Sequence, residues 1–361
     1  MISVSLCVIV KNEEEVLAGC LDSVKDIADE MVIVDTGSTD RTKEIAARYT
    51  DKIYDFEWVD HFAAARNFAF SKAEMDYILW LDADDIFLEK DREKLIELKA
   101  SLSKEVDAVS MYYHVGFDDR GEVSFRYRRN RLVKREKGFR WIGAVHEYLE
   151  VYGNIIETEI AVTHRKSEKQ HSPPSDRNLR IYEKMAENSE TMTPRDLFYF
   201  ANELKDHGQY QRAITYYHHF LSTKQCWIED EIRTCQYLSD CYRAVGHEEA
   251  AMTSLLKSFL IDCPRPEFCC RLGDFFAEKR QYRQGVFWYE LALSAKGSDA
   301  GFTQLEFSTW YPHLQLCVCY WQLGDREKAK IHNDKAASYH PSHPSVLYNQ
   351  NVLGTSHQKK S

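Results

Sequence analysis

Three short apolar runs, each ending in polar or acidic residues, constrain the fold of this chain more than any other feature. The runs are 4–10, 31–35 and 77–81, and no charged residue interrupts them before their ends. Continuous apolar runs of this length are typical of strands that are covered on both faces. Helix-like segments at 15–24, 41–49 and 62–72 separate them, and 52–55 is a further short strand. This β-α-β-α order predicts a mostly parallel α/β sheet.

The pattern changes beyond about residue 106. The segments 108–114, 122–133 and 155–164 predict strands in a mixed or antiparallel arrangement. The segment 166–175 contains Pro173 and Pro174 and predicts a linker. We therefore expect a first domain at 1–170.

From about residue 194 the sequence predicts helices only, and it repeats. Four similar turns are followed by small residues at Ala213, Ala251, Gly285 and Ala329, which are 38, 34 and 44 residues apart. Aromatic residues precede each turn, and prolines close two of the units. This pattern resembles the tetratricopeptide (TPR) repeat, and a generic helical bundle is the alternative. We expect TPR-like repeats at 171–353 and a disordered tail at 354–361.

Composition excludes several classes of protein. The 361 residues carry a net charge of -10, which argues against a nucleic-acid-binding protein. No apolar run approaches the roughly 18 residues of a membrane span. The first residues lack the basic segment of a signal peptide, and the ten cysteines lack zinc-site spacing. We expect a cytoplasmic protein whose cysteines are reduced and packed as small apolar residues.

Four motifs in the first 85 residues carry the chemistry. They are Ile9-Val10-Lys11-Asn12-Glu13, Val34-Asp35-Thr36-Gly37-Ser38-Thr39-Asp40, Ala65-Arg66-Asn67 and Leu81-Asp82-Ala83-Asp84-Asp85. In this order they resemble the family 2 glycosyltransferases of the GT-A fold, which transfer a sugar from a nucleotide-sugar donor with inversion. The resemblance covers about 1–165. It implies a GT-A domain with a Rossmann-like α/β sheet.

The acidic motif at the end of the run 77–81 suits a divalent metal. A nucleotide diphosphate gains charge as its bond to the sugar breaks, and Mg²⁺ or Mn²⁺ with carboxylate ligands relieves that charge. The resemblance implies that Asp84 is the direct ligand, that Asp82 lies nearer the ribose and that His164 completes the metal site. The plainer alternative is an acidic turn beside a surface histidine.

Other residues of these motifs predict the donor site. The resemblance implies that Asp35 contacts the nucleoside, and the Gly37-Ser38 turn lets the backbone approach the ligand. Arg66 either binds the nucleotide or orders the acidic loop, and a surface ion pair is its alternative. The full set that we expect around the donor is Val10, Asn12, Glu14, Asp35, Gly37, Ser38, Arg66, Asp82 and Ala83. For Asp35 and Glu14 the alternative is a role at a helix start.

The acceptor needs a general base, because its hydroxyl or thiol loses a proton as it attacks. The phrase Arg140-Trp141-Ile142-Gly143-Ala144-Val145-His146-Glu147 is similar to one in family members with attached helical repeats. We expect Glu147 to be the base and His146 to contact the acceptor or the sugar. Asp85 is the second candidate base, and polar residues at a strand edge are the alternative for the pair.

Eight basic residues stand together in an otherwise acidic chain. They are Arg126, Arg128, Arg129, Arg131, Lys134, Arg135, Lys137 and Arg140. Each of the pairs Arg126/Arg128 and Arg129/Arg131 is expected to share a strand face. The stretch either binds the diphosphate or acceptor, or it is a solvated strand edge.

With these residues in place, the resemblance implies an inverting, metal-dependent hexosyltransferase that uses a UDP-sugar. The whole-chain arrangement resembles the bacterial sublancin-type peptide S-glycosyltransferases, which implies a protein or peptide acceptor with a reactive cysteine. A serine, a threonine or a glycan remains open as acceptor, and the repeats serve either the acceptor or a homodimer. The rivals are a TPR adaptor with an inactive transferase-like domain and a nucleotidyltransferase. The segment after the first strand lacks the Gly-rich signature of the latter.

Overall fold

The computed structural model describes residues 1–117, 121–165, 176–188, 191–295 and 303–355. It divides into two compact units, Met1–Met192 and Thr193–Ser361. The linker expected at 166–175, and with it the expected domain boundary at 170, lies outside the described residues, as does 356–361 of the expected tail. Helix α5 (Asp176–Glu187) belongs to the first unit.

A mixed sheet in the order β3-β2-β1-β4-β7-β6-β10-β5 forms the first unit. The pairs β1–β2, β1–β4, β2–β3 and β6–β10 are parallel, and β4–β7, β6–β7 and β5–β10 are antiparallel. The expected parallel first half and mixed second half are therefore confirmed. The strands are β1 (Val4–Val10), β2 (Glu30–Asp35), β3 (Ile53–Asp55), β4 (Tyr77–Leu81), β5 (Asp85–Ile86), β6 (Ala108–Phe117), β7 (Val123–Lys134) and β10 (Ile155–His164).

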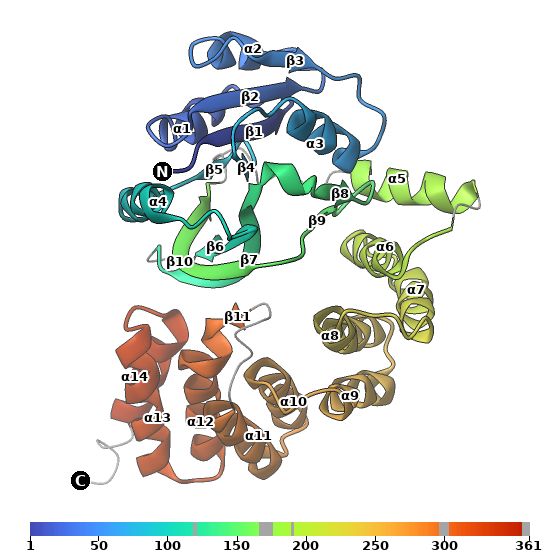
Figure 1. The fold of residues 1–361 in the computed structure, drawn as a ribbon. Helices are drawn as coiled ribbons and strands as arrows, with labels where there is room; N and C mark the ends of the chain where they lie inside the picture. The colour runs from blue at the N-terminus through green and yellow to red at the C-terminus, as the bar shows by residue number, and fades with distance from the viewer. Residues whose placement is uncertain (118–120, 166–175, 189–190, 296–302, 356–361) are drawn as a thin grey trace. The chain divides into compact units, whose positions relative to one another are not determined.

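Both faces of this sheet are buried, which explains why its first strands read as continuous apolar runs. Alternate residues enter two separate cores: Leu6 and Val8 lie in one, and Cys7 lies in the other. Helices α1 (Leu17–Asp22), α2 (Thr42–Ala46) and α4 (Glu89–Ser101) pack on the first face, and α3 (Phe62–Ser71) packs on the second (Figure 1).

Helix α4 is absent from the elements expected from the sequence, because its buried face is largely charged. Leu95 is buried together with Asp91 and Lys99, one turn before it and one turn after it. Asp91 accepts a hydrogen bond from the backbone N–H of Ala161, and Lys99 donates one to the carbonyl of Ile27. These tertiary bonds replace the apolar stripe that a sequence pattern detects.

A two-stranded hairpin, β8 (Arg140–Ile142) and β9 (Tyr148–Glu150), packs beside α3. Trp141 of the hairpin lies against Trp80 of β4, with ring centroids 4.6 Å apart. Asn67 of α3 fixes β8 by two hydrogen bonds of 2.9 Å to the backbone of Trp141. The hairpin therefore holds the loop 143–147 next to α3.

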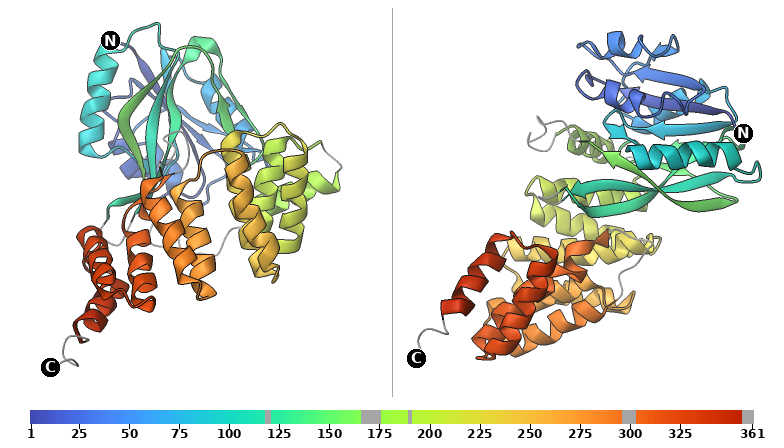
Figure 2. Two further views of the ribbon diagram at one scale, coloured as in Figure 1. Left: turned by 90° about the horizontal axis from the view of Figure 1, so that it is seen from below. Right: turned by 90° about the vertical axis from the view of Figure 1, so that its left-hand side faces the viewer.

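The second unit consists of helix pairs, as the repeat predicts. Each pair consists of two consecutive helices, and successive pairs lie side by side (Figure 2). The helices are α6 (Pro194–Asp206), α7 (Tyr210–Ser222), α8 (Ile228–Ala244), α9 (Glu248–Lys257), α10 (Pro266–Glu278), α11 (Tyr282–Ser294), α12 (Trp310–Gln322), α13 (Arg326–Tyr339) and α14 (Pro344–Thr355). The four small residues Ala213, Ala251, Gly285 and Ala329 are buried at the pair contacts.

The turns inside the pairs share one backbone conformation. Gly208, Gly246 and Gly324 have positive φ angles of 72°, 82° and 84°, and Arg280 adopts the same left-handed conformation at 58°. Glycine reaches this region without a steric penalty, whereas an arginine does not. The third turn therefore keeps the geometry of the repeat without its usual residue.

All ten cysteines are free, and eight of them are buried or nearly buried as small apolar residues. Cys263 is exposed and Cys226 is half-buried. Within the described ranges, no helix is long and apolar enough to cross a membrane.

Candidate active site

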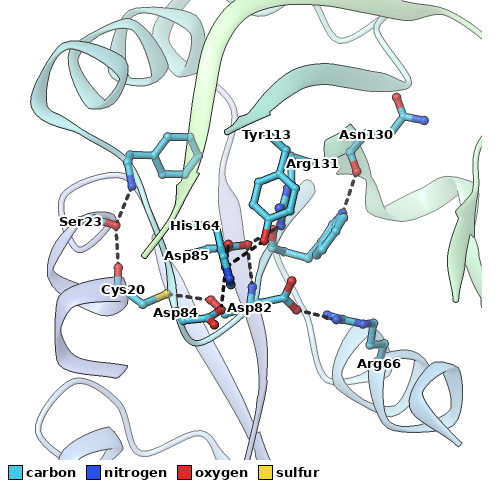
Figure 3. Close-up of polar contacts among 12 residues, drawn as sticks. Cys20, Ser23, Arg66, Asp82, Asp84, Asp85, Tyr113, Asn130, Arg131 and His164 are labelled. Atoms are coloured by element: carbon cyan, nitrogen blue, oxygen red, sulfur yellow. Dashed lines mark hydrogen bonds and ion pairs between the residues drawn. The ribbon is translucent and has the colours of Figure 1, made fainter. Parts of the chain in front are cut away.

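The acidic motif forms a tight loop between β4 and β5. The N–H of Asp85 donates to the carbonyl of Asp82 at 3.0 Å, and the N–H of Asp82 donates to Oδ2 of Asp85 at 3.1 Å. Ser23 supports the loop from α1, since its Oγ accepts from the N–H of Phe87 (Figure 3). These contacts hold the carboxylates at the carboxyl end of β4, where ligands of parallel α/β sheets bind.

Pairing between β5 and β10 brings His164 to this loop. The two strands are antiparallel, and His164 pairs with Asp85. Nδ1 of His164 lies 3.4 Å from Oδ1 of Asp84, 3.6 Å from Oδ1 of Asp85 and 3.2 Å from the hydroxyl of Tyr113 (Figure 3). The carboxylate of Asp84, and with it that of Asp85, stabilises the protonated ring and raises the pKa of His164 to about 9.

One carboxylate oxygen of Asp84, one of Asp85 and one ring nitrogen of His164 lie within 4.8 Å of one another. Oδ1 of Asp85 is buried and makes no hydrogen bond within 3.5 Å, since Nδ1 of His164 lies 3.6 Å away, whereas its Oδ2 pairs with Arg131 at 2.9 Å. A buried carboxylate oxygen without a hydrogen bond is costly unless a cation or a ligand meets it. This donor set fits a hard divalent cation. Asp84 and His164 lie together as expected, and Asp85, which the sequence analysis treated as a candidate base, lies with them.

Arg66 joins the acidic loop to the hairpin loop. Its Nη2 donates to Asp82 at 2.5 Å and its Nε donates to Glu147 at 2.6 Å. The guanidinium is buried and lies over the rings of Trp80 and Trp141, at 5.2 and 4.7 Å from their centroids. Burial alone would raise the pKa of Asp82, but the charges of Arg66, Arg131 and Arg129 lower it well below its usual range.

A cavity of about 190 Å³ opens beside this ion pair. Asp82, Asp84 and Glu13 are the acidic residues of its wall, and the other lining residues are basic, aromatic, aliphatic or small. The full lining is Ile9, Val10, Lys11, Glu13, Thr36, Trp58, Phe62, Arg66, Asp82, Ala83, Asp84 and Arg177. Its size and its mixed polar and aromatic wall suit part of a polar small molecule.

The residues after β1 and β2 form one interlocked turn. The N–H of Asn12 donates to Oγ of Ser38 at 2.9 Å, and Oδ1 of Asn12 accepts from the N–H of Thr39 at 2.8 Å. Asp35 accepts the N–H of Ser38 on both of its oxygens, and Gly37 takes a φ of 102°. Asn12, Asp35, Gly37 and Ser38 are therefore brought together at the ends of these strands.

Glu14 and Glu13 take different positions. Glu14 pairs with Arg41 at 3.0 Å on the surface and does not line the cavity. Its neighbour Glu13 does, and burial together with Asp84, Asp40 and Asp82 raises the pKa of Glu13 to about 7. Two adjacent glutamates after a strand point in different directions, and only the backbone path decides which one enters the site.

His146 occupies a strained position in the hairpin loop. Its φ is 49°, Gly143 before it has a φ of 103°, and the carbonyl of Ala144 accepts from the N–H of Phe62. The His146 ring stacks on Tyr182 of α5 at 6.4 Å and 9°, and the hydroxyl of Tyr182 donates to the carbonyl of Val145. Strained residues of this kind are common at functional sites.

Comparisons with known proteins agree with this geometry. Residues 5–154 match the family model described as Glycosyl transferase family 2. The first unit carries a family 2 glycosyltransferase domain. The second unit consists of TPR-like repeats. A solved TPR protein of Thermus thermophilus, TTC0263, aligns over 49% of this chain and 89% of its own with 16% identity and a TM-score of 0.36.

Three curated relatives cover parts of the chain. It is 39% identical over 150 residues to the TPR repeat-containing protein Synpcc7942_0270 of Synechococcus elongatus, covering 42% of this chain and 36% of that protein. It is 27% identical over 220 residues to the glycosyltransferase SunS of Bacillus subtilis, covering 58% of this chain and 51% of that protein. It is 32% identical over 159 residues to the lipopolysaccharide core biosynthesis glycosyltransferase LpsC of Rhizobium meliloti, covering 42% of this chain and 58% of that protein. The chain thus spans about a third and about half of the length of the first two.

The basic stretch begins on strand β7. This strand pairs with β6 along most of its length, whereas β4 pairs with it only at Leu132, Val133 and Lys134. The arginines of β7 therefore lie before the part of the strand that β4 covers. Arg131 is fully buried against Asp85.

Sequence reasoning missed several residues of this site. Trp58, Phe62 and Arg177 line the cavity, and the guanidinium of Arg177 lies 4.6 Å from the ring of Phe62. Arg177 lies 93 residues or more along the sequence from every other lining residue. No spacing rule joins positions so distant, although the cluster of aromatics at 56–62 was a visible signal.

Proposed function

We propose that this chain transfers a sugar from a UDP-sugar to a protein or peptide acceptor by inverting displacement. One observation carries the proposal. A set of metal-compatible ligands, a polar cavity and an acidic residue on a strained loop meet in one place, and Arg66 joins the last two. The family match over 5–154 supports the reaction class.

The cavity is proposed to hold the donor. Asp35 and the Asn12–Ser38 turn lie at the ends of β2 and β1, beside Val10, which lines the cavity. Carboxylate and amide oxygens there accept hydrogen bonds from a nucleoside. Trp58 and Phe62 offer ring faces for a base or a sugar.

Asp84, Asp85 and His164 would hold Mg²⁺ or Mn²⁺ in this proposal, and the ion would neutralise charge on the diphosphate. Arg131 fixes the second oxygen of Asp85, so that Oδ1 stays directed to the cluster. Support of a ligand by such a neighbour raises its precision.

Glu147 is proposed to take the proton of the acceptor. It is a carboxylate on the loop 143–147, it is nearly buried, and its Oε1 is anchored by Arg66. Its second oxygen is not engaged by Arg66, and a base needs one such oxygen within hydrogen-bond reach of the acceptor. Asp85, the second candidate base, is fully buried and paired, which disfavours it.

The resemblance of the whole-chain arrangement to the sublancin-type peptide S-glycosyltransferases favours a peptide acceptor, with cysteine tested first. The similarity to LpsC favours a second candidate, transfer to a glycan. The adaptor alternative lacks support, because the acidic and histidine ligands are present and close together.

Hydrolysis of a panel of UDP- and GDP-sugars with manganese, followed as released nucleotide, tests the proposal. We expect one donor to be cleaved and Asp84→Ala to abolish both cleavage and the thermal shift caused by UDP with manganese. Asp51→Ala, at an exposed site outside the cavity, is the matched control. Absence of cleavage and of any thermal shift in the wild type would contradict the proposal and favour the adaptor.

A further inference from the structure

The arginines of β7 are sorted onto two sides of the strand. The guanidinium groups of Arg126 and Arg128 lie over the ring of Tyr112, at 4.3 and 3.8 Å. Those of Arg129 and Arg131 lie instead by the rings of Trp80 and Tyr113. The second pair therefore lies on the side of the strand that faces the metal-compatible cluster.

These two arginines differ in what they bind. Arg131 is fully buried, pairs with Asp85 at 2.9 Å and donates to the carbonyl of Trp80. Arg129 is half-buried, and within the described part of the chain its guanidinium makes no hydrogen bond or ion pair. Its guanidinium lies by the rings of Trp80, Tyr113 and Tyr127, at 5.5 to 5.6 Å from their centroids.

Ring contacts compensate little of the cost of burying such a charge. Cation–π contacts contribute about 0.5–1 kcal/mol each at partly exposed sites. A guanidinium carries five N–H donors, and a partly buried one is normally paired. Arg129 therefore has donors available for an anion that is not part of the chain.

The charge of Arg129 acts on the donor cavity. Together with Arg66 and Arg131, it opposes the effect of burial and lowers the pKa of Asp82, which lines the cavity. Arg129 also contacts the ring of Tyr113, whose hydroxyl lies 3.2 Å from His164 of the cluster. The unused cation is thus one aromatic ring away from the cluster.

A diphosphate in this place meets strong repulsion. Asp82, Asp84, Asp85 and Glu147 lie close to one another, and Arg66 must serve two of them. A single divalent ion compensates only part of the added charge. Further cations near the cluster would compensate the rest. Lys11 and Arg177 line the cavity itself, and Arg129 lies beside Tyr113 on the β7 side of the cluster.

We propose that Arg129 binds the β-phosphate of the donor and stabilises the charge that develops on it, an inference that rests on the function proposed above. As the bond between the anomeric carbon and the β-phosphate oxygen breaks, its electron pair remains on that oxygen. Arg129 donates N–H bonds to the phosphate. The acceptor sulfur or oxygen forms the new bond to the anomeric carbon, and its proton passes to Glu147. UDP leaves with the negative charge that Arg129 stabilises.

Binding of UDP and of UMP, measured by calorimetry with manganese, separates the β-phosphate from the rest of the nucleotide. We expect Arg129→Gln to weaken the binding of UDP at least about 10-fold, since hydrogen bonds to charged groups are of this strength. The affinity for UMP should change less than about 2-fold. Arg129→Lys should recover part of the loss, because it keeps the charge. Arg126→Gln, on the same strand but over Tyr112, should leave both affinities unchanged.

Hydrolysis of the donor gives a second readout. We expect Arg129→Gln to lower kcat more than it raises KM, because the charge grows only as the bond breaks. A circular dichroism spectrum and a Tm close to those of the wild type establish that the variant is folded, and Arg129→Lys serves if the glutamine variant is not.

Three results decide the matter. Equal effects on UDP and UMP, or none on either, would overturn the assignment to the β-phosphate. A variant that binds UDP normally but loses only its preference between a UDP-hexuronate and the matching UDP-hexose would overturn it too, and would assign Arg129 to a sugar carboxylate. Failure of the wild-type chain to bind UDP with manganese would contradict the proposed function instead.

Discussion

Arg66 shows how a single residue can hold a site together. It is one buried cation between two carboxylates, Asp82 from the metal loop and Glu147 from the hairpin loop. Its guanidinium lies over the rings of Trp80 and Trp141, which hold it between the two carboxylates. The sequence allowed either a nucleotide contact or an ordering role for Arg66, and the observed bonds to both loops favour ordering.

Loss of Arg66 should destabilise the first unit strongly. Arg66→Met keeps the volume but leaves two partly buried carboxylates facing each other, which costs about 3 kcal/mol in the free energy of unfolding. Arg41→Met breaks the exposed pair with Glu14 and should cost less than about 1 kcal/mol. Urea unfolding measures both. Equal losses would show that the Arg66 bridge is no stronger than a surface pair.

Glu147 should matter for chemistry and not for donor binding. Glu147→Gln keeps the shape and an oxygen for Arg66 but cannot accept a proton, so we expect UDP affinity within about 2-fold of the wild type and donor hydrolysis reduced about 10²–10⁴-fold. Glu150→Gln, on the exposed side of β9, is the control. Undiminished hydrolysis in the Glu147 variant would place the base elsewhere.

At the scale of elements, short pairings decide which residues meet. The strand β5 has two residues, yet its antiparallel pairing with β10 places His164 next to Asp85. A two-residue strand leaves no periodic signal. This is why the sequence predicted Asp84 and His164 as metal ligands but assigned Asp85 a different role.

The turn at Arg280 gives a test of the repeat geometry. Its left-handed conformation costs a residue with a Cβ about 1–2 kcal/mol. Glycine removes this cost but loses more conformational entropy on folding. Arg280→Gly should therefore raise the free energy of unfolding of the second unit by up to about 1 kcal/mol. Gly246→Ala, in the equivalent turn, should lower it by a similar amount. Thermal unfolding compares the two. A stabilising Gly246→Ala would contradict the shared conformation.

At the scale of the molecule, α5 decides where the first unit ends. Tyr182 is fully buried and donates to the carbonyl of Val145, directly before His146 and Glu147. Leu179 and Ile181 of the same helix are also buried. The helix therefore supports the loop that carries the proposed base, although the sequence placed it in the repeat domain.

Two truncations test this division. We expect residues 1–192 to fold and to hydrolyse the donor slowly, because they contain α5 and the whole cavity. Residues 1–175 should unfold at a lower temperature and lose hydrolysis, since the loop 143–147 loses its support and Arg177 is missing. Circular dichroism and nucleotide release measure both. Equal activity of the two fragments would show that α5 is dispensable.

The sequence by itself determined the two-part architecture, the central strands and the acidic motif. Those features depend on local periodicity and on turn chemistry, which neighbouring residues express directly. Only the tertiary structure decided that Arg131 is buried against Asp85, that Asp85 faces His164, that Glu13 and not Glu14 reaches the cavity, and that Arg66 joins Asp82 to Glu147. The physical reason is that each of these depends on the direction of a side chain across strands or loops far apart in the chain. A shift of one residue in the pairing of two strands turns a side chain to the other face of the sheet, and no local pattern in the sequence shows that pairing.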